Sequence, residues 1–150
     1  ATKDWHPRGH VSFASAHEGK KPLDTHVLNG KEEMLWPDHC VQGSHGAELH
    51  RDLAAALDGE KVKAKVHVVL KGTELKTDPY SGFETTTASP HASASSGSLL
   101  TAHLHALDIR QVYIVGLATD YCVKHTTLHA IRDGFETFVI REACRGVAEE

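Results

Sequence analysis

Helical and extended patterns alternate along most of this chain, and the alternation limits the folds that it can adopt. Three segments place apolar residues at helical spacing, and three short apolar runs are typical of buried strands. In chain order, helices and strands are expected over residues 46–57, 65–70, 98–107, 112–115, 120–132 and 136–140. Strands that alternate with helices form a parallel sheet with right-handed crossovers and helices on both faces. The sequence therefore predicts an α/β fold, a three-layer α/β/α arrangement with a mostly parallel sheet.

Two long stretches show no sustained period and are predicted to be loops. Residues 4–37 are rich in His, Gly, Pro, Lys and Asp, with room for short extended pieces. Residues 77–97 are rich in Ser, Thr, Pro and Gly. Loops of this length in compact domains are usually functional. Neither stretch divides the chain, so residues 1–150 are expected to form a single domain.

The composition of the chain excludes some classes of binding partner and indicates the cellular compartment. The formal net charge is −4, with both signs interspersed, so no basic stripe for nucleic acid and no polybasic patch for a membrane is expected. No apolar run approaches the roughly 20 residues that span a bilayer. Three cysteines without a C-x-x-C pair argue against a disulfide framework. We expect a small-molecule substrate and a reducing compartment, the cytoplasm or, in a eukaryote, also the nucleus.

Cys122 is the candidate nucleophile, because it follows an expected strand and lies in the first turn of an expected helix. Unpartnered amides and the positive end of the helix dipole stabilise a thiolate there. The small residues Gly116 and Ala118 leave room for a substrate carbonyl to approach backbone N–H groups that form an oxyanion hole. The alternative is a small buried apolar residue, which is the role expected of Cys40 and Cys144.

Lys71 directly follows the strand expected over 65–70, so its ammonium is expected at the same sheet edge as Cys122. A cation beside a thiol lowers the pKa of that thiol. The alternative is a lysine that points into water. Residues that begin helices also have a default role as N-caps, and this alternative applies to Ser98, Thr119 and Asp120.

Asp4 and His6 are candidate metal ligands, because side chains two residues apart in an extended segment point to the same face. His39, in a turn stiffened by Pro37, is the candidate third ligand, and His10 is a reserve. One carboxylate with two imidazoles suits a single divalent metal, and zinc is expected, with iron or manganese as alternatives. Solvated histidines in a loop are the simpler explanation.

Three aromatic residues fall in the predicted loops and turns near these motifs: Trp36, Tyr80 and Tyr121. A flat ring substrate would be bound between aromatic walls of this kind. Aromatic side chains more often belong to a core, so each of them alone is a weak indication.

Together these segments resemble the nicotinamidases, also called pyrazinamidases, of the isochorismatase-like hydrolase superfamily. The motifs that carry the resemblance are spread over nearly the whole chain, in the order found in that family. They are Asp4-Trp5-His6-Pro7 with His10-Val11-Ser12-Phe13, Trp36-Pro37-Asp38-His39-Cys40-Val41-Gln42-Gly43, Lys71-Gly72 leading to Tyr80-Ser81-Gly82-Phe83, and Gly116-Leu117-Ala118-Thr119-Asp120-Tyr121-Cys122-Val123.

The resemblance assigns roles to most of the candidate residues. Asp4, His6 and His39 match the metal ligands of the family, and Lys71 and Cys122 match two of its three catalytic residues. Backbone amides of Ala118 and Cys122 match the oxyanion hole. The bond between Leu117 and Ala118 falls where the family has a cis peptide. Residues that match the substrate pocket are Trp36, Tyr80, Ala118 and Tyr121.

The implied activity is hydrolysis of nicotinamide to nicotinate and ammonia through a cysteine thioester, in NAD salvage. Nicotinamide or a pyrazinamide-like analogue would be the substrate, its ring nitrogen bound to the metal, and a homo-oligomer is possible. The third catalytic residue of the family, an aspartate, would lie upstream of Ala1, and the final helix and strand would lie downstream. The chain is accordingly expected to be incomplete at both ends and inactive alone.

Two alternatives to this activity stay open on the sequence. The first is another amidase of the superfamily that acts on a carbamoyl or ureido compound. The second is a catalytically silent fragment that binds a metal or a ligand, because the family's aspartate has no counterpart among these residues.

Overall fold

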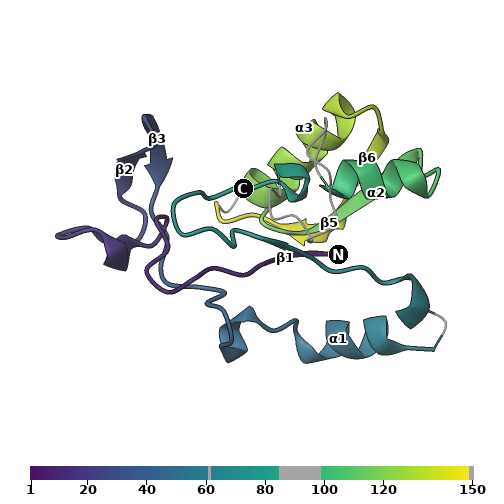
Figure 1. Cartoon of the computed structure of the whole chain (residues 1–150), viewed down its shortest axis with the longest axis horizontal. Helices are drawn as coiled ribbons and strands as arrows, with labels where there is room; N and C mark the ends of the chain where they lie inside the picture. The colour runs from purple at the N-terminus through teal and green to yellow at the C-terminus, as the bar shows by residue number, and fades with distance from the viewer. Residues whose placement is uncertain (61, 85–98, 149–150) are drawn as a thin grey trace. The chain divides into compact units, whose positions relative to one another are not determined.

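The computed structural model describes residues 1–60, 62–84 and 99–148 and divides the chain into two compact units. Unit 1 is Ala1–Asp78 and unit 2 is Pro79–Glu150 (Figure 1). Strand pairing is mainly parallel, as the alternation of helices and strands predicts. That the chain forms a single domain stays a prediction.

Unit 1 is built around a short parallel pair and a hairpin. Strand β1 (Thr2–Asp4) pairs in parallel with β4 (Val69–Lys71), so that Asp4 lies opposite Lys71. Strands β2 (Thr25–Leu28) and β3 (Lys31–Met34) form an antiparallel hairpin inside the stretch predicted to be loop. The connecting residues Asn29 and Gly30 have φ of 51° and 80°, the left-handed conformation that a tight hairpin turn requires.

Two expected elements of unit 1 are shorter than the sequence pattern indicates. Helix α1 covers Arg51–Asp58 and not 46–57, because the imidazole of His50 accepts a hydrogen bond from the Asp52 amide and caps the helix there. A 3-10 turn (His45–Ala47) precedes it. The strand expected over 65–70 was also placed wrongly, since Lys63–Lys65 forms a 3-10 turn and β4 has only the three residues that β1 can pair.

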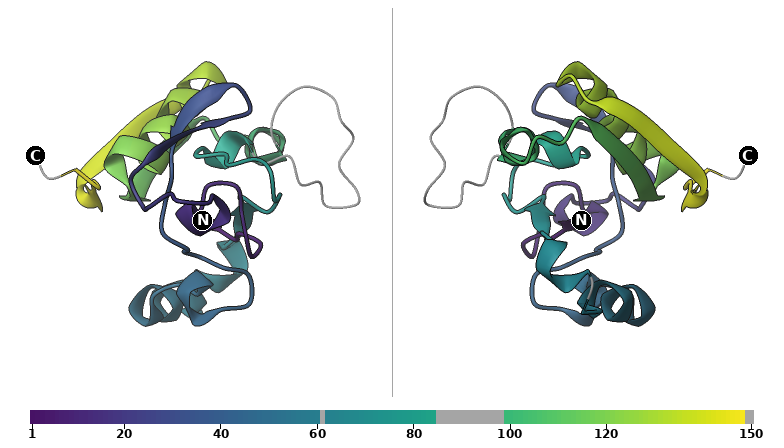
Figure 2. Two further views of the ribbon diagram at one scale, coloured as in Figure 1. Left: turned by 90° about the vertical axis from the view of Figure 1, so that its left-hand side faces the viewer. Right: turned by 90° about the vertical axis from the view of Figure 1, so that its right-hand side faces the viewer.

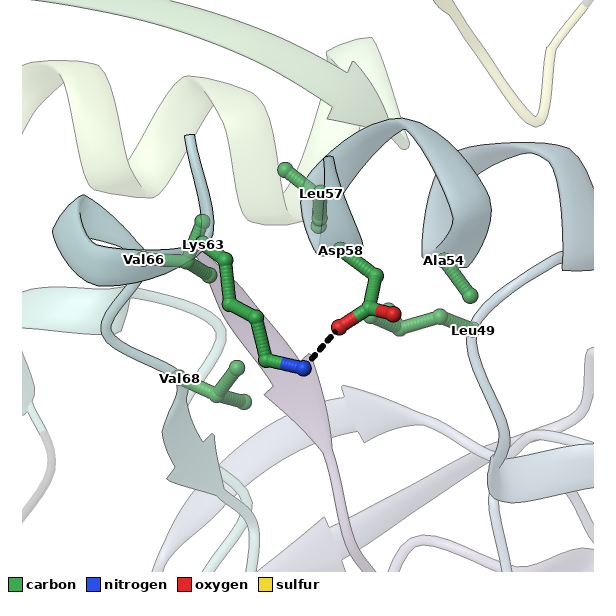
Figure 3. A pocket seen from close by; sticks show the side chains of 7 residues that line it. All are labelled: Leu49, Ala54, Leu57, Asp58, Lys63, Val66 and Val68. Carbon is green, nitrogen blue, oxygen red and sulfur yellow. Dashed lines mark ion pairs between the residues drawn. The ribbon is translucent and has the colours of Figure 1, made fainter. Parts of the chain in front are cut away.

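The apolar residues that were assigned to a longer strand line a pocket with α1 instead. Val66 and Val68 face the helix across this pocket (Figure 3). An ion pair of 2.6 Å between Lys63 and Asp58 lies beside them. The complete lining of the pocket is Leu49, Ala54, Leu57, Asp58, Lys63, Val66 and Val68.

Unit 2 contains a parallel pair of longer strands covered by helices. Strand β5 (Gln111–Leu117) pairs with β6 (Glu136–Arg145), and α3 (Lys124–Arg132) lies behind them in the right-hand view of Figure 2. Helix α2 covers Leu99–Ala106 and a 3-10 turn covers Gly82–Glu84. The core consists of Phe83, Ala130 and Phe135, with Leu100, Leu104, Val112 and Ile114 packed against it.

Strand β5 alternates strictly between a covered and an exposed face, as a strand of period two must. Val112 and Ile114 pack on the core, whereas Tyr113 and Val115 on the opposite face are more than half exposed. The Tyr113 ring stacks on Phe138 of β6 at 5.0 Å. The helix expected over 120–132 begins as a five-residue π-helical turn, Thr119–Val123, and becomes α-helical at Lys124.

Some predictions concern residues that the structure does not describe. Ser98, a possible N-cap, and most of the loop expected over 77–97 lie outside the described residues. Among the helices of the described part of the chain, none combines the length and the apolar character needed to cross a membrane.

Replacing Phe135 with Ala is predicted to destabilise unit 2 by about 3–5 kcal/mol, because the removed ring leaves a cavity in a close-packed core. Phe135 is 4% exposed and lies 5.8 Å from the Phe83 ring. Urea unfolding followed by circular dichroism measures the change. Leu128→Ala on the exposed side of α3 is the control, with an expected change within about 0.5 kcal/mol. Equal losses in the two variants would show that Phe135 is not a core residue.

Candidate functional site

Three side chains of unit 1 that the sequence nominates as metal ligands lie together. Asp4, His6 and His39 each offer one ligand atom, and these atoms all lie within 4.8 Å of one another. Asp4 ends β1, and His6 follows two residues later with the same orientation. The His6 amide donates to the Cys40 carbonyl at 3.0 Å, and the Gln42 amide donates to the His6 carbonyl at 2.8 Å. These backbone bonds bring His39 to the end of β1.

Hydrogen bonds fix the orientation of both imidazoles. The Nδ1 atom of His6 lies 2.9 Å from the Gly72 carbonyl oxygen, and that of His39 lies 2.8 Å from the Pro37 carbonyl oxygen. A carbonyl oxygen only accepts, so Nδ1 is the donor in each ring, and Nε2 is the nitrogen that is left to coordinate a metal. Metal-bound histidines typically donate their second ring N–H to a backbone carbonyl in this way. The donor set therefore fits a divalent metal.

Burial keeps His6 neutral. The residue is 1% exposed, and desolvation lowers the pKa of its imidazole below the ordinary value, which outweighs the opposing effect of the Asp4 carboxylate. A neutral imidazole is the form that coordinates a metal. His6 is therefore ready to act as a ligand at neutral pH without first losing a proton.

Gly72 has a conformation and a position that His6 requires. Its φ is +62°, and a Cβ atom there would lie 2.2 Å from Cε1 and 2.4 Å from Nδ1 of His6. A side chain at residue 72 would therefore displace the imidazole. In the sequence Gly72 stands out only as part of a motif, although a glycine directly after a strand signals a backbone turn of this kind.

His10, the reserve ligand, has a different set of contacts. Its Nδ1 lies 2.8 Å from the Ser12 hydroxyl and its Nε2 lies 3.0 Å from the Thr77 carbonyl oxygen, so both nitrogens are engaged. With His6 and Asp78 it forms a second group whose ligand atoms lie within 4.8 Å. Its ring centroid is 4.3 Å from that of His6. These contacts make His10 part of the wall that packs against His6.

Lys71 is buried and ion-paired. The residue is 5% exposed, and its Nζ donates to Oδ1 of Asp4, its partner across the β1–β4 pair. The alternative of a lysine that points into water is therefore wrong. The reason is register, because parallel pairing places the last residues of both strands side by side.

Cys122 lies in unit 2 on the π-helical turn and is half-buried. The Ala118 carbonyl accepts from the amides of Tyr121 at 3.1 Å and Val123 at 3.0 Å. The Leu117–Ala118 peptide bond is cis, as the resemblance implies. Ala118 occupies the N-cap position and no side chain caps the turn, so neither Thr119 nor Asp120 has the capping role.

Tyr80 and Tyr121 come together in unit 2. Their ring centroids are 5.5 Å apart, and the imidazole of His125 stacks on Tyr80 at 5.3 Å. His125 was not identified from the sequence, although it follows Tyr121 by four residues, the spacing of neighbours on a helix. Trp36 belongs to unit 1, where its amide donates to the Ser12 carbonyl at 2.7 Å.

The candidate residues thus form two groups. In unit 1 the structure brings together Asp4, His6, His39 and Lys71. In unit 2 the Tyr80 ring lies beside that of Tyr121, which is on the turn that holds Cys122. None of these residues lines the pocket of Figure 3. Of the two remaining cysteines, Cys144 is 5% exposed, as expected, whereas Cys40 is half-buried.

Known proteins similar to this chain include curated nicotinamidases. The chain is 42% identical to one from Acinetobacter baylyi over 97% of its own length and 62% of that protein. It is 40% identical to one from Escherichia coli over 98% of its length and 62% of that protein. The chain therefore spans about three fifths of the length of these relatives.

Solved structures give the same likeness. An Acinetobacter baumanii nicotinamidase superposes with a TM-score of 0.81 at 39% identity, over 99% of this chain and 66% of that one. The yeast nicotinamidase Pnc1p bound to nicotinaldehyde superposes with a TM-score of 0.83 at 29% identity, over 99% of this chain and 68% of that one. A zinc complex of Pyrococcus horikoshii pyrazinamidase superposes with a TM-score of 0.65 at 32% identity, over 99% of this chain and 62% of that one. The fold is that of isochorismatase-like hydrolases, an α/β fold.

A family model described as the isochorismatase domain matches residues 9–150. The match includes His39, Lys71 and Cys122 and continues through both units. The chain belongs to the isochorismatase family.

Proposed function

We propose that the protein carrying this chain hydrolyses nicotinamide to nicotinate and ammonia through a thioester on Cys122, in NAD salvage. The observation that carries the proposal is the pair of oriented imidazoles beside Asp4, in a chain that also presents a cysteine on a strand-to-helix turn. Relatives named nicotinamidases, one of them bound to nicotinaldehyde, support the substrate. A reducing compartment such as the cytoplasm is the proposed location, because it keeps cysteine thiols reduced.

Asp4, His6 and His39 are the proposed metal ligands, and zinc is the proposed metal, with iron or manganese as alternatives. The mixture of one carboxylate and two imidazoles suits these ions. The similar pyrazinamidase of Pyrococcus horikoshii forms a complex with zinc. A bound divalent cation would supply a Lewis acid for the pyridine nitrogen and so orient the ring.

Cys122 is the proposed nucleophile. Its sulfur attacks the amide carbon, the proton lost by the thiol passes to the amide nitrogen as the C–N bond breaks, and ammonia leaves a thioester behind. Water then attacks the thioester carbon, which releases nicotinate and regenerates the thiol. Backbone amides of Ala118 and Cys122 are the proposed donors to the oxyanion that forms in each step.

Lys71 is the second proposed catalytic residue, and the aromatic residues are the proposed walls of the ring site. The buried ammonium of Lys71 pairs with the partly exposed carboxylate of Asp4 and so holds the end of β1 beside the end of β4. Trp36, Tyr80 and Tyr121 are the proposed substrate-binding residues, and the rings of Tyr80 and Tyr121 already lie 5.5 Å apart.

Replacing Cys122 with Ala is predicted to lower ammonia release from nicotinamide by about a thousandfold or more, since no other group replaces the nucleophile. Cys144→Ala is the control, because Cys144 is buried and its thiol has no proposed role. Ammonia is measured by a coupled assay in the protein that carries this sequence.

The same assay separates the proposed substrate from its rivals. Pyrazinamide is expected to be hydrolysed. Carbamoyl and ureido compounds are expected not to be hydrolysed. Retained activity in Cys122→Ala would rule out the thioester route, and preference for a carbamoyl compound would rule out nicotinamide as the substrate. Zinc binding without hydrolysis of any of these amides would indicate a silent metal-binding protein.

Replacing Gly72 with Ala is predicted to weaken zinc binding by about 10–100-fold, because the new methyl group displaces the His6 ring. Gly19→Ala is the matched control: Gly19 also has a positive φ, +73°, but nothing lies within 4 Å of its Cβ position. Both variants strain the backbone, and only one touches the site. A competition titration with a chromophoric chelator gives both affinities. Equal zinc affinities in the two variants would contradict the assignment of His6 as a ligand.

A further inference from the structure

Asp120 makes contacts that the proposed function does not use. Its carboxylate oxygens accept hydrogen bonds from the Val147 amide, at 3.0 Å and 3.2 Å, and from the Ala148 amide, at 3.0 Å. These donors are 27 and 28 residues away in the chain, just after the end of β6. One side chain therefore joins the turn that holds Cys122 to the segment that follows β6.

The segment after β6 is shaped around this carboxylate. A Cβ atom on Gly146 would lie 3.1 Å from the Ala148 carbonyl oxygen and 3.5 Å from Oδ1 of Asp120. A contact of 3.1 Å is tighter than ordinary van der Waals contact, so a side chain at residue 146 would force the backbone to move. Glycine at this position allows two consecutive amides, those of Val147 and Ala148, to point at the same carboxylate.

Asp120 is also held in its charged form. Hydrogen bonds from the Ala148 and Val147 amides lower the pKa of its carboxyl group, and the nearby Lys124 acts in the same direction. Bonds from N–H groups to an ionised carboxylate are stronger than those between neutral partners. The link is therefore present at neutral pH.

Backbone hydrogen bonds hold the turn at both ends, since the Lys124 amide at its end donates to the Thr119 and Tyr121 carbonyls. The turn has only five residues, from Thr119 to Val123, and no side chain caps its first turn. The Ala118 carbonyl accepts two of its amides. Asp120 lies two residues before Cys122, so a long-range bond at Asp120 restrains the backbone that sets the direction of the thiol.

We propose that Asp120 is a positioning residue for Cys122: its carboxylate binds the Val147 and Ala148 amides and so fixes the turn that presents the thiol. The inference depends on the proposed function only in treating Cys122 as the nucleophile. Two effects of Asp120 have opposite signs. A fixed turn keeps N–H groups aligned toward a thiolate, whereas the bare negative charge of a carboxylate disfavours one.

Two measurements on the whole chain test this role without substrate. Amide hydrogen exchange by NMR reports on Val147 and Ala148, and mass spectrometry of iodoacetamide-treated protein gives the alkylation rate of each cysteine against pH. In Asp120→Ala, exchange at the two amides is expected to rise about tenfold or more. The alkylation profile of Cys122 is expected to move to higher pH by about half a unit, with a smaller shift in Asp120→Asn.

Asp133→Asn is the matched control. Asp133 is a carboxylate of the same unit that accepts hydrogen bonds from Arg132 and Thr101, and its pKa is also lowered. Its donors are side chains and not backbone amides, and among the described residues no hydrogen bond joins it to the segment after β6. This variant is expected to leave both the exchange at Val147 and the Cys122 profile unchanged, and Cys40 provides an internal reference in every sample.

Each other outcome would overturn the inference. A Cys122 profile that moves to lower pH would show that Asp120 acts through its charge. An unchanged profile with faster amide exchange would show that the link is only structural, and unchanged exchange would show that the link is not formed. Alkylation needs no turnover, so absence of nicotinamide hydrolysis would refute the proposed function and leave this result intact.

Discussion

The ion pair between Lys71 and Asp4 is the interaction on which the proposed metal site of unit 1 depends. Lys71 is 5% exposed, and a buried ammonium without a partner costs several kcal/mol. Parallel pairing of β1 with β4 supplies the partner by placing Asp4 opposite Lys71. The next residue, Gly72, then turns the chain and offers its carbonyl to His6. Orientation of the first imidazole thus follows from the pairing of two short strands.

The same contacts extend to His39, the third proposed ligand. His6 exchanges backbone hydrogen bonds with Cys40 and Gln42, and these bonds hold the segment that contains His39. His39 in turn is oriented by the carbonyl of Pro37, two residues earlier. Each proposed ligand is therefore positioned by backbone groups of unit 1. Flexible side chains on a surface loop would not give this arrangement, which is why the explanation of simply solvated histidines does not hold for His6.

The sequence predicted residue types and the order of elements better than it predicted contacts. Apolar periodicity located α2, α3, β5 and β6, because the core of unit 2 is formed by residues at regular spacing. It extended β4 and α1 too far, since Val66 and Val68 are equally suitable for a strand and for a pocket wall. Asp-x-His spacing singled out two proposed ligands that do lie together, but the roles of Gly72 and Asp120 depend on bonds that join distant segments. No local pattern contains that information.

The central claim is that Asp4, His6 and His39 hold a divalent metal through oxygen and nitrogen, which leaves the thiol of Cys122 available for chemistry. X-ray absorption spectroscopy at the zinc edge of the zinc-loaded protein tests it directly. The predicted spectrum shows a first shell of only oxygen and nitrogen scatterers, with the outer-shell pattern of two imidazoles, near 2.0–2.1 Å as a rough expectation. A sulfur scatterer near about 2.3 Å would contradict the claim, because it would make a cysteine a metal ligand.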